Sequence, residues 1–374
     1  MFGKIRYLHI FVLTGAVTTA LIFAFLHHES ARSRTIASSE ISEPPARTVG
    51  LNDEPAICKN LYKIACQKRN QTRRDPTGLV RPDVEGERIV VSMYKDIIEK
   101  HPDWSSDQVD TELTRVVFTP QRRGRIEAAY HWVQNRIEQY IETQPEHVFT
   151  AREKKLLKQR VHNTVLEIPP PASLYEDEPD LLTKNDVFYE RTTDGKTRMR
   201  VGGAYLFTAK SWFNMVFTMA HELGHSIDPC EVRSARLSFP AYDRLVACFL
   251  KTGVVAMTKV RAECQENDQL SETFADWVAS EITSEALKTF STEFHGTQLV
   301  NATTNAIRDL CEEEEDGDEL DVVSHPSPKV RIEKIFGNQP VIRSILGCAQ
   351  VQPSPSEYCS FDSDLSSYTK KVSL

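Results

Sequence analysis

The sequence predicts a mainly α-helical α+β fold in which a small β-sheet lies beside a helix that carries two histidines. Apolar residues recur every three or four positions through much of residues 84–168, which is typical of amphipathic helices. Two β-prone runs within residues 185–207 meet around Asp194-Gly195, which predicts a hairpin. The motif His-Glu-Leu-Gly-His at residues 221–225 lies in the apolar-periodic segment that follows.

Composition places the chain among folded proteins and argues against nucleic acid as a partner. The 374 residues are 40% hydrophobic, which is enough to bury one large core or two smaller ones. The formal net charge is -8, and the largest charge run, residues 312–321, is acidic. Because nucleic-acid binding needs a basic surface, we expect no nucleic-acid partner.

The N-terminal segment predicts a membrane anchor. Lys4 and Arg6 lie in a short tail, residues 1–6, that we expect to stay cytoplasmic. Residues 7–26 are uncharged and long enough to span a bilayer as a helix, and residues 27–56 resemble a flexible stalk in composition. We therefore expect a single-pass type II membrane protein whose remaining chain lies outside the cytoplasm. If the apolar segment is instead cleaved as a signal peptide, the chain is secreted.

Cysteine usage agrees with export. All eight cysteines lie beyond the apolar segment, and an even set in an oxidising compartment predicts up to four disulfides. There is no C-x-x-C pair, so a structural zinc ribbon has little support. The disulfide candidates are Cys58, Cys66, Cys230, Cys248, Cys264, Cys311, Cys348 and Cys359.

The folded part divides into two predicted regions. Residues 57–182 form an N-terminal helical region without a chemical signature, in which Thr150 and Glu153 make a capping box. Residues 183–374 form the catalytic region, which starts with the hairpin. Within it we expect residues 201–207 to form the edge strand that aligns a substrate backbone, with two glycines allowing close approach.

The histidine motif predicts a zinc site. A helix beginning near Ser211 places His221 and His225 one above the other, so that both imidazoles can bind one tetrahedral Zn²⁺. Glu222, one step round the helix, can take a proton from a metal-bound water. The next acidic helix, residues 270–282, offers Glu272 as the third ligand.

Further polar residues are expected to support these ligands. Asp276 shares a helical face with the glutamate ligand and would accept the N–H of a ligand histidine, most simply His221. Asp228 would serve His225 in the same way. Later in the chain, His325 could stabilise the oxyanion of a tetrahedral intermediate. Arg331 could hold the substrate carbonyl or brace Asp276.

These motifs together resemble the neprilysin family of zinc metallopeptidases, membrane-anchored ectoenzymes that cleave peptides. The similar segments are HELGHSID, SETFAD, the cysteine pair that opens the ectodomain, and the late His325, Arg331 and Asn338. The resemblance implies a gluzincin-type domain with one zinc ion per chain. It also implies the pairs Cys58–Cys348 and Cys66–Cys311. Cys359 would then pair with Cys264 or Cys248, leaving Cys230 to the other.

The chain departs from that family in length. The predicted helical region before the hairpin spans only residues 57–182, so this would be a short form with a reduced helical region and a more open cleft. The segment nearest to the family's substrate-binding strand begins at Asn185 but is not intact. Within this reading the expected function is zinc-dependent endopeptidase activity on peptides or proteins.

Two alternatives stay open at this point. HELGH, Glu-x-x-Ala-Asp and SHPSPKVRI are also similar to membrane proteases of the prenyl-protease and HtpX type, although those proteins usually have several membrane spans. The other alternative is a zinc-containing ectodomain that binds peptides or partner proteins without cleaving them. Degenerate relatives of hydrolases normally lose the base or a ligand, whereas this chain keeps both.

Overall fold

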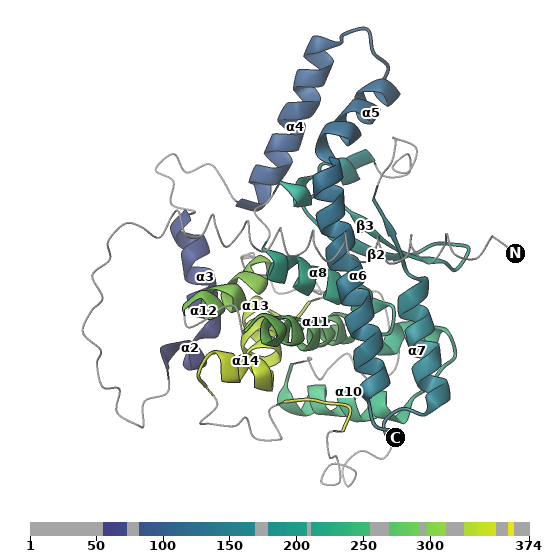
Figure 1. Ribbon diagram of the computed structural model, residues 1–374, viewed down its shortest axis with the longest axis vertical. Coiled ribbons are helices and arrows are strands. Elements are labelled where there is room, and N and C mark those ends of the chain that lie inside the picture. Colours follow the sequence, from purple (N-terminus) through teal and green to yellow (C-terminus); the bar gives the residue numbers. More distant parts are fainter. Residues whose placement is uncertain are drawn as a thin grey trace, which may run out of the picture. The chain divides into compact units, whose positions relative to one another are not determined.

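The protein folds as a mainly helical unit, residues 54–374, with one three-stranded sheet in the part that the structure describes (Figure 1). This confirms the predicted fold class at the level of its secondary structure. Among the described helices none is long and apolar enough to cross a membrane, and the predicted tail, the anchor and nearly all of the stalk lie outside the described residues. The computed structural model describes residues 55–72, 82–168, 179–207, 211–254, 269–291, 297–311, 325–348 and 358–362.

Helices α5, α6 and α7 of the N-terminal region begin at side-chain caps that the sequence supplies. Thr150 and Glu153 form the predicted capping box, and Ser105 forms a second one. The periodic apolar residues predicted for this region lie on one buried face of a 24-residue helix. The helices are α2 (Ala56–Lys59), α3 (Leu61–Thr72), α4 (Pro82–Lys100), α5 (Ser106–Val117), α6 (Pro120–Thr143) and α7 (Ala151–Asn163).

The sheet contains the predicted hairpin and one further strand. Strands β2 (Val187–Arg191) and β3 (Thr197–Val201) pair antiparallel, and β1 (Val165–Glu167) pairs parallel with β3. The order is therefore β1-β3-β2, with β3 in the centre. Gly195 in the turn has φ +82°, a left-handed conformation that glycine adopts without strain.

The predicted edge strand at residues 201–207 was wrong. Val201 ends the central strand, and Ala204–Leu206 form the short 3₁₀ helix η3. The two glycines admit the chain's own backbone instead of a substrate. A Cβ on Gly202 would lie 2.2 Å from the carbonyl oxygen of Lys184, and one on Gly203 would lie 2.0 Å from that of Leu182. The edges of this sheet are β1 and β2.

The region predicted to be catalytic, residues 183–374, follows the hairpin with a set of helices around α8 and α11, which pack closely against each other. Helix α8 begins where the sequence predicted, and the side chain of Ser211 caps it by accepting the backbone N–H of Asn214. Helices α6 and α12 and strand β2 also pack on α8 (Figure 1). The elements are η2 (Pro179–Leu182), α8 (Trp212–His225), α9 (Pro229–Ser234), α10 (Pro240–Thr252), α11 (Gln269–Phe290), α12 (Thr297–Ala306), η4 (Arg308–Leu310), α13 (Pro328–Val330), the π-helix η5 (Arg331–Phe336) and α14 (Pro340–Ile345).

Gly224 sets the distance between α8 and α11. A Cβ at this position would lie 3.2 Å from the Cα of Ala275 and 3.3 Å from the Cβ of Val278, which is tighter than most real contacts. The glycine inside the HELGH motif therefore lets the two helices approach closely. Their facing side chains are consequently brought within bonding distance of one another.

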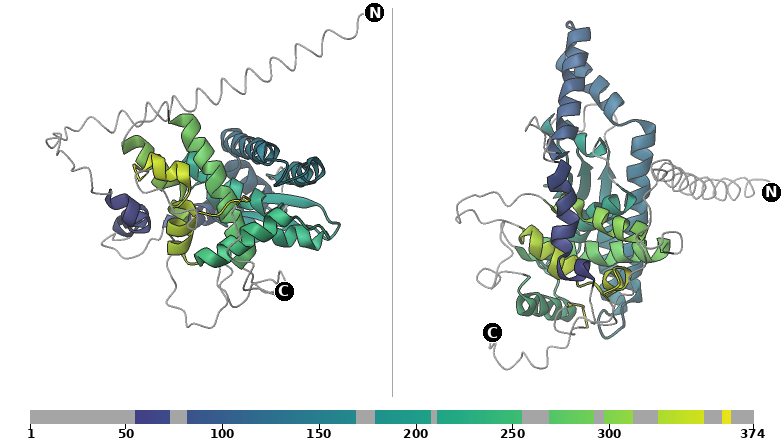
Figure 2. Two further views of the ribbon diagram at one scale, coloured as in Figure 1. Left: turned by 90° about the horizontal axis from the view of Figure 1, so that it is seen from below. Right: turned by 90° about the vertical axis from the view of Figure 1, so that its left-hand side faces the viewer.

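Among the described residues, three disulfides join distant parts of the chain. Cys58–Cys348 and Cys66–Cys311 confirm the pairs that the family resemblance implied. Cys359 pairs with Cys248, which settles the alternative left open by the sequence. Cys230 is also disulfide-bonded, and Cys264 lies outside the described residues. As a result α3 lies beside α12 and η5, elements from the other end of the chain (Figure 2).

We predict that Glu281→Gln on α11 stabilises the protein at alkaline pH. Burial raises the pKa of Glu281 from 4.5 to about 8, helped by the charge of Glu285 and opposed by a hydrogen bond with Gln339. The folded state therefore keeps a proton that the unfolded state loses, and stability falls as the pH rises through this window. The amide cannot ionise and should lose less stability.

The measurement is the urea midpoint of both proteins at pH 5 and pH 9, with Glu146→Gln, an exposed carboxylate, as the control. From pH 5 to pH 9, the urea midpoint of the wild type should fall more than that of Glu281→Gln. Parallel pH profiles for these two proteins would contradict the role given to this carboxyl.

Candidate metal centre

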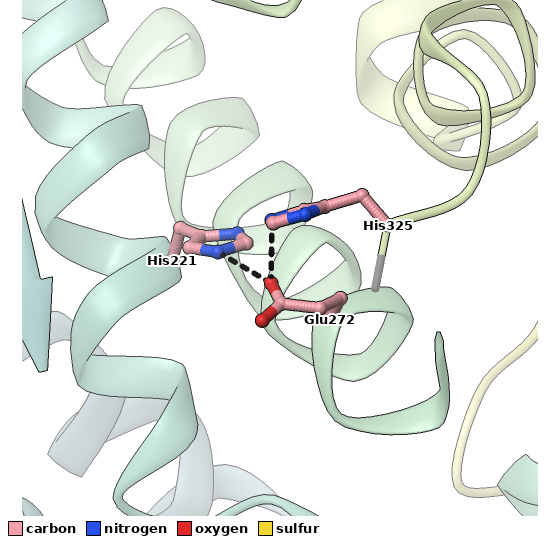
Figure 3. Close-up of side chains that lie close together, drawn as sticks. All are labelled: His221, Glu272 and His325. Atoms are coloured by element: carbon pink, nitrogen blue, oxygen red, sulfur yellow. Dashed lines mark ion pairs between the residues drawn. The ribbon is translucent and has the colours of Figure 1, made fainter. Parts of the chain in front are cut away.

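Three imidazoles from two parts of the chain surround one carboxylate oxygen. Oε2 of Glu272, on the first turn of α11, lies 3.1 Å from Nε2 of His221 and 3.6 Å from Nε2 of His225, both on α8. Nε2 of His325, in the loop before α13, lies 2.9 Å from the same oxygen. Figure 3 shows the carboxylate between His221 and His325. The structure therefore brings together all three predicted ligands.

The geometry fits a bound cation. Oε2 of Glu272 is buried but has no hydrogen-bond partner among the described residues, although three ring nitrogens lie near it. Ligand atoms of His221, Glu272 and His325 all lie within 4.8 Å of one another. This compact group contains His325, the predicted oxyanion group, in place of the predicted ligand His225. Imidazole nitrogen together with carboxylate oxygen is a donor set that suits Zn²⁺. An ion between these atoms would satisfy the oxygen that the protein leaves unpaired.

Electrostatics at the centre also favour positive charge. Burial would lower the pKa of His221, but the carboxylates of Asp276 and Glu272 outweigh it and raise that pKa to about 9. Burial would likewise raise the pKa of Glu272, yet the surrounding imidazoles hold it well below its ordinary value. The buried carboxylates therefore create a negative electrostatic potential that would stabilise a bound cation.

His221 is oriented by a braced carboxylate. Its Nδ1 lies 3.0 Å from Oδ1 of Asp276, which is 1% exposed. The guanidinium of Arg331 donates to both oxygens of that carboxylate, at 2.7 and 2.8 Å. Arg331 was predicted to hold the substrate carbonyl or to brace Asp276, and the structure contains the contact with Asp276. Burial would raise the pKa of Asp276, but Arg331 and His221 keep it below its ordinary range.

His225 has a different environment that the sequence showed only in part. Its Nδ1 lies 3.4 Å from Oδ2 of Asp228, the predicted partner, but nearer, at 3.1 Å, to Oγ of Ser271. The serine hydroxyl donates to Oδ2 of Asp228 at 2.5 Å. Sequence reasoning missed Ser271, because a serine has no signature of its own. Its one signal was its place directly before Glu272.

Glu222 lies between the imidazoles and the edge of the sheet. Oε1 is 3.9 Å from Nε2 of His221, and Oε2 accepts the backbone N–H of Tyr189 on β2 at 2.8 Å. Burial raises the pKa of Glu222, while the two imidazoles of α8 oppose this change. The carboxylate is therefore held in place by the edge strand, close to the centre. Asn185 lies two residues before that strand.

Comparison with known proteins found no matching family model, no similar curated protein and no similar solved structure. The resemblance to the neprilysin family therefore rests on the sequence motifs alone and stays an expectation. The centre is defined by the contacts described above.

We predict that Arg331→Ala destabilises the protein by about 3–5 kcal/mol, because it leaves the buried Asp276 carboxylate without its countercharge. The double variant Asp276→Asn/Arg331→Met removes both charges and should lose less stability than Arg331→Ala alone. Urea unfolding gives the free energies. Lys329→Ala, the loss of an exposed cation nearby, is the control and should cost little. A cost for Arg331→Ala no larger than that for Lys329→Ala would show that the brace contributes nothing.

Proposed function

We propose that the chain is a zinc-dependent endopeptidase that hydrolyses peptide bonds of peptides or proteins outside the cytoplasm. The observation that carries the proposal is the buried Glu272 oxygen, which faces imidazoles but lacks a hydrogen-bond partner among the described residues. His221, His225 and Glu272 would hold one zinc ion. When bound, that ion would lower the pKa of a water molecule toward about 7 and polarise a carbonyl group.

Glu222 is the proposed general base. The hydrogen bond from Tyr189 fixes one carboxylate oxygen and leaves the other beside the centre. This carboxylate takes the proton of the attacking water and later delivers it to the departing amine nitrogen. A raised pKa suits a group that must both accept and return a proton near neutral pH.

His325 is proposed to stabilise the oxyanion. Its side chain is 39% exposed, whereas those of His221 and His225 are 9% and 13% exposed. The greater exposure of His325 indicates that its side chain borders solvent, where a substrate could bind. The two imidazoles of α8 face the interior. A neutral or charged imidazole N–H at that border can donate to the oxygen of a tetrahedral intermediate.

Strand β2 favours a peptide as the substrate. At the two ends of this edge strand, the Asp186 carbonyl accepts the backbone N–H of Gly202, and the backbone N–H of Thr192 donates to the Lys196 carbonyl. The backbone groups of Asp186 and Thr192 therefore face β3. Because backbone groups alternate along a strand, those of Tyr189 face the other way. An extended peptide that pairs with this edge would lie directly beside Glu222.

We predict that Glu222→Gln keeps zinc but loses turnover by about 10²–10⁴-fold, the usual contribution of general acid–base catalysis. Glu272→Val should lose turnover and also bind zinc more weakly. The assay is hydrolysis of a quenched peptide by the purified full-length chain, with zinc content measured on the same samples. Wild-type activity retained in Glu222→Gln would refute the base. One zinc per chain without hydrolysis by the wild type would instead favour the non-catalytic binding protein.

We also expect broad size tolerance, because the predicted helical region that could cover a bound substrate, residues 57–182, is short. A graded set of substrates, from short peptides to an intact unfolded protein, should all be cleaved. Product masses and initial rates give the size dependence. Strict restriction to short peptides would contradict the open cleft but leave the zinc chemistry in place.

A further inference from the structure

We propose that Ser271 is a positioning residue that orients His225 through a hydrogen-bond relay ending on Asp228. The proposal rests on the zinc centre proposed above but not on hydrolysis. Its basis is that the serine oxygen is closer to Nδ1 of His225 than the carboxylate is, at 3.1 against 3.4 Å. The carboxylate predicted to serve this histidine therefore reaches it mainly through a hydroxyl group.

The relay has a direction that fixes the imidazole tautomer. The Ser271 hydroxyl donates its one proton to Oδ2 of Asp228. Its oxygen is consequently an acceptor toward His225, so the imidazole must carry its proton on Nδ1. In the neutral imidazole, the form that binds a metal, Nε2 would then have the free lone pair, and this nitrogen lies 3.6 Å from Oε2 of Glu272. A ligand histidine needs this arrangement.

The far end of the relay is rigidly held. Asp228 is 3% exposed and is the N-cap of α9, where its Oδ1 accepts the backbone N–H of Glu231 at 2.6 Å. Arg160 from α7 donates to the backbone carbonyl of Ser226 and pairs with the Glu231 carboxylate at 2.7 Å. The carboxylate thus has one oxygen for the helix cap and the other for the relay.

The relay also links two ligands across helices. Ser271 directly precedes Glu272 on α11, while His225 is the last residue of α8. The residue that contacts His225 is therefore the chain neighbour of Glu272. His221 has no such intermediary, since Asp276 contacts it directly at 3.0 Å. We infer that Ser271 tunes the affinity of the centre through His225 alone.

Zinc affinity of the full-length chain, measured by competition with a chromogenic chelator, tests the relay. Removing an outer partner of a ligand histidine typically costs 10–100-fold, so Ser271→Ala should weaken zinc binding by about tenfold or more. Ser271→Thr keeps the hydroxyl and should bind within about threefold of the wild type. Ser271→Val, which matches threonine in shape but lacks the hydroxyl, should resemble Ser271→Ala.

Two further measurements separate positioning from a general structural effect. Ser280→Ala removes another buried hydroxyl of α11, one that bonds only to the carbonyl of Trp277, and should leave affinity unchanged. In an Asp228→Asn background, which retains a good helix cap, Ser271→Ala should cost less than in the wild type, because the relay is already altered.

The zinc affinities of these variants distinguish a positioning role of Ser271 from a purely structural one. Unchanged zinc affinity in Ser271→Ala, with a lower unfolding midpoint of the metal-free protein, would overturn the relay and leave Ser271 a structural residue. Equal losses in Ser271→Thr and Ser271→Val would overturn it as well. Failure of the wild type to bind zinc would remove the proposed centre and the relay together. Zinc binding that depends on Ser271 without peptide hydrolysis would support the relay and refute the endopeptidase.

Discussion

The close packing of α8 on α11 is the constraint on which the rest of the structure depends. Gly224 removes the side chain that would separate the two helices, and its neighbour across the interface is the backbone of Ala275. Small buried residues on both helices, such as Ala220 and Ala279, continue the contact. The imidazoles of α8 can reach the carboxylate of α11 only because the two backbones lie so near each other. Gly224 is therefore needed for the geometry of the centre.

Burying three carboxylates beside each other requires that each has a specific partner, because an unpaired buried charge is costly. Asp276 has the forked guanidinium of Arg331, and Asp228 has a helix N-terminus and a hydroxyl. Glu272 has only imidazoles, which contact it without hydrogen-bond geometry among the described residues. Of these three carboxylates, Glu272 is the one with a buried oxygen that lacks a hydrogen-bond partner among the described residues.

The parts that the sequence predicted well are those set by residues close together in the chain. The start of α8 at Ser211, the capping box at Thr150 and the turn at Gly195 depend on hydrogen bonds or backbone angles within a few positions. The face shared by His221 and His225 follows from helical periodicity alone. The helices and the pairing of β2 with β3 could be predicted for this reason.

What the sequence could not provide depends on which distant segments meet. Gly202 and Gly203 predicted close approach by another backbone, but not that this backbone would be the chain's own at Leu182 and Lys184. The partner of Cys359 is likewise a matter of which helix lies near it, and spacing does not encode that. Ser271 belongs to the same class, since its role comes from the meeting of α8, α9 and α11.

The covalent links extend the constraint from the centre to the ends of the folded unit. The segment 325–348 supplies His325 and Arg331, and its last residue is bonded to Cys58. Leu61 of α3 packs 3.2 Å from where a Cβ on Gly337 would lie, just after η5. The N-terminal helices therefore hold the π-helix that places the guanidinium against Asp276. Disulfides that close such long loops restrict the unfolded chain most strongly, so an oxidising compartment would stabilise the brace of His221 from a distance.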